Sequence, residues 1–516
     1  MDEQFHKKNK LVGKALVMFV IMIISKILGF SRDILLTYKF GTSEIVDAYT
    51  VALTLPSVLF AVFVSGLNQS YLPYYTRKES DKERQQLFSN TLILYFMLSL
   101  LVAFVSYGFR TQIAALLAPG FDSARRSICE SFIGIVIWML PFHAVFALMS
   151  AQLQTNEDFN AANICDFLII NVVVIISILV ATLNTPRVLA IGYLLSMVAA
   201  CAALGVYFIF RGGVRFQPKK ENALHDFKEL MVIAIPVGLS YMVNQLNSVT
   251  DSVFSSTFST GVTSGLNYAN KLQSFFLALT TTVFMTIVFP RLNKYFAQNN
   301  LRDGAYYIKK GITLSTFLSI PFAAFIGAFS REIVVSLFQR GAFDEKSTII
   351  TAGCLALYSV GIPFYSFVEI GSRTLTAALK QKLILKNTTI AVSVNILADY
   401  ILMKMIGYIG LSLATSISGM LLFVLYFIDI HKMGLNCFPR EITKEIVKIL
   451  VATLCATVMA LIIRAILPES LSTLANTVIV AVAFGLGYFI MCFVFKVDVI
   501  KWLLNNMNFL QKKNSI

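Results

Sequence analysis

Residues 188–210 read VLAIGYLLSMVAACAALGVYFIF, a run without a single charged side chain. A helix that crosses the roughly 30 Å hydrocarbon layer of a membrane needs about 20 consecutive apolar residues, and this one run is long enough. A soluble domain cannot accommodate many such runs, because most of its surface has to be polar. The stretch therefore predicts a membrane-spanning helix.

Comparable apolar runs occur along the whole chain and give, with this one, fourteen predicted membrane-spanning helices. The other thirteen lie near 11–36, 45–69, 86–107, 128–151, 161–182, 230–257, 267–290, 311–330, 348–370, 384–403, 408–430, 446–467 and 472–495. Of the 516 residues, 57% are hydrophobic and only 14% are charged, whereas soluble domains are about 25% charged. We therefore expect an all-α polytopic membrane protein. Soluble enzymes, disordered scaffolds and secreted disulfide proteins are excluded.

The net charge of +15 is explained by the distribution of basic residues among the loops. If both termini are cytoplasmic, the termini and the connections on that side hold 28 Lys and Arg residues, and the opposite side holds 10. Loops rich in Lys and Arg stay in the cytoplasm. This orientation accounts for the charge without nucleic acid as a partner.

The residues that most often carry enzyme chemistry form no pattern in this chain. Its seven cysteines show no CxxC or metal-ligand spacing, and its four histidines are scattered. Most of the cysteines lie in apolar runs, where a thiol behaves as a small buried hydrophobe. No nucleophile–base pair or nucleotide-binding loop occurs in the polar segments. We therefore expect a protein that is not an enzyme.

The first twelve predicted helices form two similar halves. A pattern in the first two helices of one half recurs at an offset of 217–219 residues: Asp33, Phe40, Thr42, Tyr49 and Pro73 correspond to Asp251, Phe258, Thr260, Tyr268 and Pro290. Six helices per half give both copies the same orientation, which is the parallel-repeat arrangement of many transporters. We expect an N-lobe over 1–228 (helices 1–6), a C-lobe over 229–432 (helices 7–12), and helices 13–14 with a cytoplasmic tail over 433–516.

Charged side chains inside the predicted helices are candidates for function, since insertion of a central Arg, Lys or Asp costs about 2.5–3.5 kcal/mol. Lys26 and Arg32 lie late in the first helix, Asp47 opens the second, and Lys271 lies in the eighth. One alternative is that such residues lie near the membrane surface and extend to water. For Arg32, another is an ion pair with Asp33 that only fixes the first helix.

A second group of polar residues carries oxygen atoms. Asp251 lies in the seventh predicted helix, Asn395 and Asp399 lie four apart on one face of the eleventh, and Thr415 lies in the twelfth. Carboxylate, amide and hydroxyl oxygens suit a hard cation or a proton relay. The alternative is a cluster of hydrogen bonds between helices, worth about 0.6 kcal/mol each.

Several short motifs resemble the MurJ/MviN lipid II flippases, a family of the multidrug/oligosaccharidyl-lipid/polysaccharide exporter superfamily. The motifs are SKILGFSRD at 25–33, Phe40-Gly41, Asp47-Ala48, LFQRGAF at 337–343, Arg373 with AALK at 377–380, and GLSLATS at 410–416. The resemblance extends over essentially all fourteen predicted helices. The RGAF segment is its most specific part.

This resemblance implies a flippase that moves the undecaprenyl-pyrophosphate-linked peptidoglycan precursor, lipid II, from the inner to the outer leaflet by alternating access. It implies a cationic cavity for the head group, with Lys26, Arg32, Asp47 and Lys271 as substrate-binding residues. It also implies a sodium site, with Na⁺ as the coupling ion, formed by Asp251, Asn395, Asp399, Thr415 and the backbone carbonyl of Leu411. The expected protein is a monomer in the bacterial cell membrane, with membrane lipids and the lipid-linked glycan as its partners.

One departure from the family pattern leaves the substrate open. Where the family usually places one or two arginines in the second helix, this chain has Phe60-Ala61. Lys26 and Lys271 stand where the family usually has Arg, and Lys binds phosphate without the bidentate geometry of Arg. The alternatives are a flippase for another undecaprenyl-linked polysaccharide unit, a drug/cation antiporter of the same superfamily, and a non-transporting flippase relative that acts as a scaffold.

Overall fold

The computed structural model describes residues 21–500, apart from 22–23, 79, 156–157, 159, 212–215, 220–222, 299 and 469. Every regular element in this described part is a helix. The prediction of an all-α protein is therefore confirmed. The first ten residues of the predicted first helix (11–20) lie outside the described residues.

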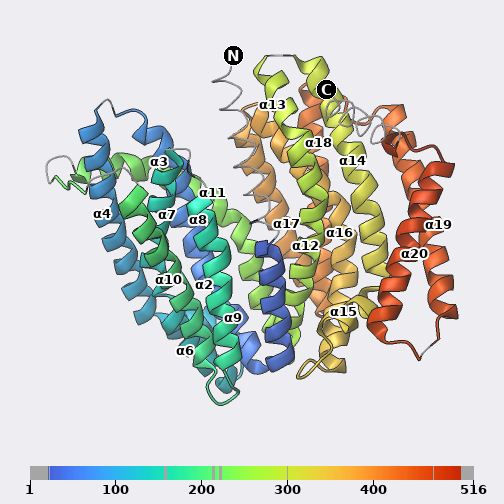
Figure 1. The fold of residues 1–516 in the computed structure, drawn as a ribbon, viewed down its shortest axis with the longest axis horizontal. Coiled ribbons are helices and arrows are strands. Elements are labelled where there is room, and N and C mark those ends of the chain that lie inside the picture. Colours follow the sequence, from blue (N-terminus) through green and yellow to red (C-terminus); the bar gives the residue numbers. More distant parts are fainter. Residues whose placement is uncertain are drawn as a thin grey trace. The chain divides into compact units, whose positions relative to one another are not determined.

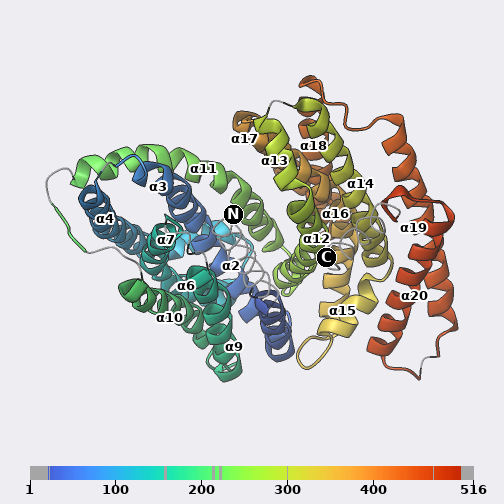
Figure 2. The ribbon, with the colours of Figure 1, turned by 45° about the horizontal axis from the view of Figure 1, so that its top comes forward.

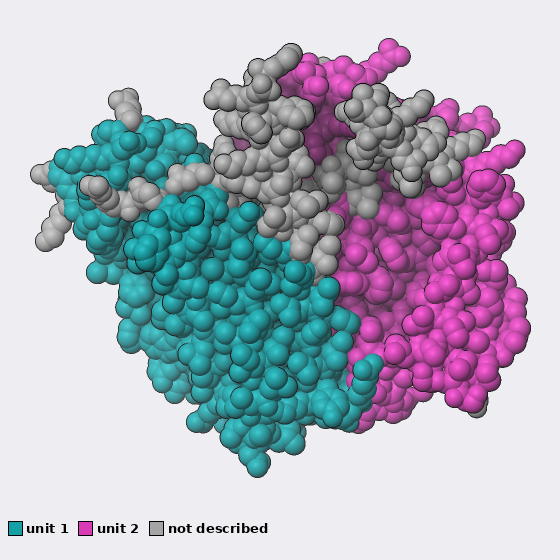
Figure 3. All heavy atoms as spheres, in the orientation of Figure 1, with its two compact units in different colours: residues 1–264, 340–343 teal, residues 265–339, 344–516 magenta. Residues whose placement is uncertain are grey.

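The chain divides into two compact units (Figure 3). Unit 1 comprises residues 1–264 and 340–343, and unit 2 comprises residues 265–339 and 344–516. The predicted lobe boundary at 228/229 follows the sequence repeat and would place most of the helix α11 in the C-lobe. In the structure, α11 belongs to unit 1. That helix packs against η1 and α3. The internal repeat itself stays a prediction.

Unit 1 begins with a helix over residues 24–40 and continues to α11. Its further helices are α2 (Glu44–Phe60), η1 (Ala61–Ser65), α3 (Gly66–Tyr75), α4 (Asp81–Gly108), α5 (Arg110–Leu117), α6 (Ser123–Val136), α7 (Met139–Thr155), α8 (Asn160–Ile164), η2 (Cys165–Ile169), α9 (Ile170–Val180), α10 (Arg187–Arg211) and α11 (Ala223–Ser255). The two η elements are π-helical turns, which often mark functional regions of longer helices.

Unit 2 holds the remaining helices, except for the first three residues of α12, which belong to unit 1. They are α12 (Val262–Ile287), α13 (Phe289–Ala297), α14 (Leu301–Ala328), α15 (Ser330–Phe338), α16 (Glu345–Ala377), α17 (Gln381–Ile406), α18 (Ile409–Lys432), α19 (Arg440–Ile466) and α20 (Thr473–Val494). Helices α19 and α20 lie side by side (Figures 1 and 2), and α19 packs on α14.

Ten helical segments of the described part are long and apolar enough to cross a membrane, and the bent helix α11 makes an eleventh. The predicted spans at 45–69 and 267–290 are not among them, although the first coincides with α2, η1 and α3 and the second with α12 and the start of α13. The predicted span at 128–151 is formed by α6 and α7 together. Each predicted run from 45 onwards coincides with helix in the structure, so the polytopic fold is confirmed.

Large apolar side chains on the outer helices of unit 2 are exposed, as expected for contact with lipid. Leu454 on α19 is 65% exposed and Phe493 on α20 is 71% exposed. In water such a surface would be unfavourable by about 25 cal/mol for each Å². The small residues of α19 point the other way, with Ala452, Ala456 and Ala460 fully buried. Residues four apart share a helix face, so these alanines form a close-packing stripe.

Candidate transport site

Arg32 is held by neighbouring side chains in unit 1. It lies on the helix over 24–40, and its Nη1 donates to Asn171 Oδ1 of α9 at 3.3 Å. Its Nη2 lies 3.4 Å from Asp33 Oδ1, and 23% of the Arg32 side chain is exposed. Asn171 is fixed in turn by a 2.6 Å hydrogen bond from its amide to the carbonyl of Phe167. The guanidinium therefore has a defined position while part of it stays accessible.

Two tyrosines complete the surroundings of Arg32. Tyr49 of α2 and Tyr193 of α10 both interact electrostatically with it. Their rings meet edge to face with centroids 6.4 Å apart. Lys26, six residues earlier on the same helix, is exposed. Unit 1 thus presents two cations from one helix, one of them oriented by a hydrogen bond to Asn171 of α9.

Asp47 lies in the first turn of α2 and is fully buried. Its Oδ2 accepts a hydrogen bond from the backbone N–H of Gly261 at 2.8 Å, and its Oδ1 accepts one from Ser264 at 2.9 Å. These N–H groups surround the beginning of α12, where backbone donors lack helical partners. The carboxylate therefore joins α2 to the start of α12, and its predicted contact with substrate stays a prediction.

Arg125 gives Asp47 a counter-charge. Its Nη1 lies 4.0 Å from Asp47 Oδ2, and its side chain is 9% exposed. Arg125 also lies 3.4 Å from Asp122, the residue that caps α6. The backbone N–H of Arg125 donates to Asp122 at 2.8 Å and holds the pKa of that carboxyl below its usual range.

Lys271 lies on α12, within unit 2. Its ammonium lies 5.7 Å from the centre of the Tyr268 ring, within the range of a cation–π interaction. Tyr268 is the residue that the sequence repeat pairs with Tyr49, which lies near Arg32. Both units therefore place a cation beside the corresponding tyrosine.

The predicted sodium ligands are divided between the units. Asn395, Asp399, Leu411 and Thr415 belong to unit 2, and Asp251 belongs to unit 1. The Asp251 Oδ1 atom is buried without a hydrogen-bond partner among the described residues. An uncompensated buried carboxylate oxygen is costly, and a bound cation would satisfy it.

Helices α17 and α18 bring the other four residues together. The two helices run antiparallel, because Ser418 donates to the carbonyl of Ala391 and Gly410 lies against Leu402. Asn395 and Asp399 therefore lie between these contacts, at the level of residues 411–415 of the partner helix. Both are fully buried.

The partner helix contributes oxygen atoms at this level. The Thr415 hydroxyl donates to the Leu411 carbonyl at 3.1 Å, and both residues are buried. Carboxylate, amide, hydroxyl and carbonyl oxygens form a donor set that fits a hard monovalent cation.

Asn171 and Arg125 also take part in the candidate site, through their contacts with Arg32 and Asp47, and neither was predicted from the sequence. Asn171 is one of two amide side chains in the apolar run 161–182, and its position in the middle of that run was the signal that could have identified it. Arg125 stands beside Arg126 in a polar stretch of the sequence, where nothing indicates burial. Its partner Asp47 is distant in the chain, so only the fold reveals the pair.

Phe60 lies at the end of α2, directly before the π-helical turn η1. Its ring meets that of His143 on α7 edge to face, with centroids 4.7 Å apart. An aromatic contact therefore occupies the position where the family pattern usually has an arginine.

The RGAF segment has a structural explanation. The N–H of Ala342 donates to the carbonyl of Tyr38 at 2.9 Å. Gly341 adopts φ +59°, and a Cβ there would lie 2.3 Å from the Tyr38 carbonyl oxygen. Gly41 has φ +56°, and its Cβ would lie 2.2 Å from the carbonyl oxygen of Ala342. Only glycine fits either position. The close approach and the hydrogen bond hold residues 340–343 against the end of the first helix.

A polytopic helical protein with oriented cations and buried carboxylates inside its spans belongs to the class of membrane transporters. A profile of the family described as "Lipid II flippase MurJ" matches residues 36–482. The chain belongs to this lipid II flippase MurJ family.

Relatives and solved structures agree with this assignment. A protein of Helicobacter pylori described as "Probable lipid II flippase MurJ" is 29% identical over 416 residues, 75% of this chain and 87% of the relative. One of Rhizobium tropici with the same description is 23% identical over 422 residues, 80% and 79% of the two chains. The solved structure "Lipid II flippase MurJ, inward closed conformation" shares the fold, with a TM-score of 0.83, 24% identity and coverage of 94% of this chain and 100% of that one.

Another solved structure is more distantly similar in fold. An inward-facing multidrug resistance MATE family transporter of the MOP superfamily has a TM-score of 0.66 at 14% identity, covering 82% of this chain and 98% of the other. This likeness shows a shared fold and carries no conclusion about substrate.

Proposed function

We propose that this chain is a flippase that moves lipid II, the undecaprenyl-pyrophosphate-linked peptidoglycan precursor, from the inner to the outer leaflet by alternating access. The family match over 36–482 carries this proposal. The cations within the spans support it, because a diphosphate moving through hydrocarbon needs charge compensation.

In this proposal Arg32 is the principal phosphate ligand. A guanidinium binds phosphate oxygens through two parallel hydrogen bonds, and the contacts from Asn171 and Asp33 orient it. Lys26 and Lys271 add positive charge without that geometry. Asp47 acts on the substrate indirectly, by holding the start of α12 through its two backbone contacts.

A sodium ion is the proposed coupling ion. When bound, it would neutralise the buried carboxylates of Asp251 and Asp399. Asn395, Thr415 and the Leu411 carbonyl would complete an oxygen-only ligand set. The Asp251 Oδ1 atom, which is buried without a hydrogen-bond partner among the described residues, supports this role.

The proposed setting is the bacterial inner membrane, with the protein as a monomer and both termini in the cytoplasm. The excess of 28 over 10 basic residues supports this orientation. The ten or eleven candidate spans of the described part support a multi-pass protein.

Complementation tests the proposal. The chain is expressed in a bacterium whose own lipid II flippase can be depleted, and growth and outward movement of lipid II are measured. We expect both to be restored by the wild type and neither by Arg32→Ala or Lys271→Ala at equal membrane levels. A correctly inserted wild-type chain that fails to move lipid II would contradict the proposal and favour another undecaprenyl-linked substrate or a scaffold.

The ion is tested separately in proteoliposomes. Asp399→Asn should abolish any acceleration of flipping by sodium, while the nearby Ser393→Ala, which alters an exposed hydroxyl of the same helix, should retain it. An unchanged sodium response in Asp399→Asn would exclude this ligand set.

A further inference from the structure

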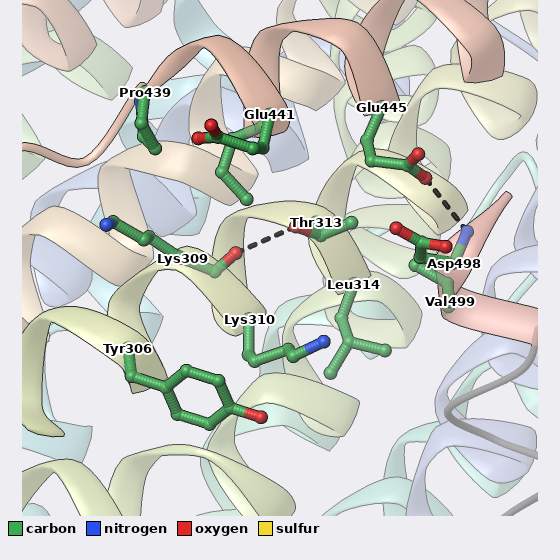
Figure 4. Close-up of a pocket in the computed structure, with 11 residues that line it drawn as sticks. Tyr306, Lys309, Lys310, Thr313, Leu314, Pro439, Glu441, Glu445, Asp498 and Val499 are labelled. Atoms are coloured by element: carbon green, nitrogen blue, oxygen red, sulfur yellow. Dashed lines mark hydrogen bonds between the residues drawn. The ribbon is translucent and has the colours of Figure 1, made fainter.

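A cavity of about 240 Å³ lies within unit 2, and none of the predicted transport residues lines it. The beginnings of α14 and α19 and the segment after α20 form its walls (Figure 4). All three are helix ends at the border of apolar spans, so the cavity lies where the head groups of membrane lipids are found.

The cavity carries charges of both signs. Lys309 and Lys310 of α14 form one wall, and Glu441, Glu445 and Asp498 form the opposite walls (Figure 4). Both lysines are half-buried, whereas Glu441 and Asp498 are exposed. Two cations and two accessible carboxylates thus line the cavity, with the Lys309 ammonium on the side of Pro439 and the Lys310 ammonium on the side of Leu314 (Figure 4).

Glu445 has a structural role in this cavity. It is 6% exposed and accepts hydrogen bonds from the Lys448 ammonium at 2.5 Å and from the backbone N–H of Asp498 at 2.9 Å. Its charge is therefore neutralised, and its contact fixes the segment that carries Asp498. Only the other two carboxylates are left for a ligand.

The start of α19 adds hydrogen-bond donors. Pro439 precedes the helix and provides no side-chain cap. The first N–H groups of a helix lack internal partners and favour a phosphate group. The same helix start carries Glu441, so the wall formed by α19 offers both backbone donors and a carboxylate.

The remaining lining is apolar or interfacial. Leu314 and Val499 are each 4% exposed and form part of the lining. Tyr306 at the mouth is 50% exposed and lies under the Lys310 ammonium, 5.8 Å from its ring centre. Tyrosine is typical of the membrane surface. Such a lining suits a ligand that has a polar head and continues into an acyl chain.

We propose that this cavity binds the head group of phosphatidylethanolamine. Its phosphate would contact the Lys310 ammonium, and its primary ammonium would donate a hydrogen bond to Asp498. Lys309 and Glu441 would contribute a second pair of opposite charges to the same cavity. An anionic phospholipid would bring its negative charge near two carboxylates without an ammonium to compensate them. A choline head group carries a positive charge but has no N–H to donate.

Native mass spectrometry of the purified full-length protein tests the proposal. Delipidated protein is titrated with phosphatidylethanolamine, phosphatidylglycerol or phosphatidylcholine of identical acyl chains. We expect the wild type to bind phosphatidylethanolamine at least several-fold more tightly than the other two lipids. Lys309→Ala with Lys310→Ala should remove this tight binding.

A second double variant tests the ammonium contact. Glu441→Gln with Asp498→Asn should abolish the preference for phosphatidylethanolamine over phosphatidylglycerol while leaving Glu445 and the fold intact. Glu83→Gln and Lys382→Ala, which change exposed charges elsewhere, are the matched controls and should bind as the wild type does.

Two results would overturn the proposal: equal or tighter binding of phosphatidylglycerol by the wild type, or an unchanged preference in the carboxylate double variant. The assay contains no transport step, so either result would leave the proposed flippase function unaffected.

Discussion

Replacing Asp47 with alanine should destabilise the connection between α2 and the beginning of α12. The substitution removes the acceptors of the Gly261 and Ser264 N–H groups, which lie 2.8 and 2.9 Å from the carboxylate. Each buried donor left without a partner costs about 1–3 kcal/mol, so the expected loss is about 2–6 kcal/mol. The buried Arg125 also loses its counter-charge at 4.0 Å, which adds to the loss.

The buried cysteines provide the assay. Six of the seven are buried and all are free, so a thiol-reactive fluorogenic dye reports unfolding during heating in detergent. A loss of 2 kcal/mol should lower the melting midpoint by roughly 2 °C, because the entropy of unfolding scales with the 516 residues of the chain. Asp47→Asn should fall between wild type and Asp47→Ala, because the amide oxygen still accepts one hydrogen bond. Glu44→Ala, an exposed carboxylate in the same helical turn, is the control. Equal midpoints for Asp47→Ala and Glu44→Ala would refute the reasoning.

Three further predictions concern other contacts. Gly341→Ala should lower the melting midpoint, because φ +59° and an oxygen 2.3 Å away leave no room for Cβ; Gly108→Ala, with nothing within 4 Å, should not lower it. Asn171→Ala should reduce flipping by misplacing Arg32, yet retain more activity than Arg32→Ala; equal loss in both would show a direct role for the amide. Asp344 caps α16, and hydrogen bonds led by that from the Ser347 hydroxyl hold its pKa below the usual 3.8. This cap should therefore stabilise the protein above about pH 4, an effect lost as the pH falls through the lowered pKa. Asp344→Ala should cost about 1 kcal/mol near pH 6 and progressively less as the pH falls below about 4; a loss that does not change with pH would contradict it.

The helices of this protein were predictable because each apolar run has to form its backbone hydrogen bonds within itself. The run 188–210 became α10, Arg187–Arg211, because every backbone polar group in hydrocarbon must be bonded within its own helix. The interruptions were not predictable in the same way. The run 45–69 contains Pro56, yet nothing in its sequence indicates that a π-helical turn follows at Ala61–Ser65.

The candidate site was predictable as a set of residues and not as a set of contacts. Arg32 and Asp399 were identified because charge inside a span is costly. The use of Asp47 as a backbone acceptor depends on residues more than 200 positions away, and no local pattern encodes that distance. Asn171 is a second example, because its role depends on a hydrogen bond from Arg32, which lies on a different helix.

Reconstitution into proteoliposomes tests the central claim most directly. Fluorescent lipid II is placed in both leaflets, and its accessibility to a membrane-impermeant quencher is followed with wild type and Arg32→Ala. We expect the wild type to move lipid II between leaflets, and Arg32→Ala to behave like protein-free vesicles. Equal movement in the two proteins, or none in the wild type, would contradict a flippase in which this arginine receives the diphosphate.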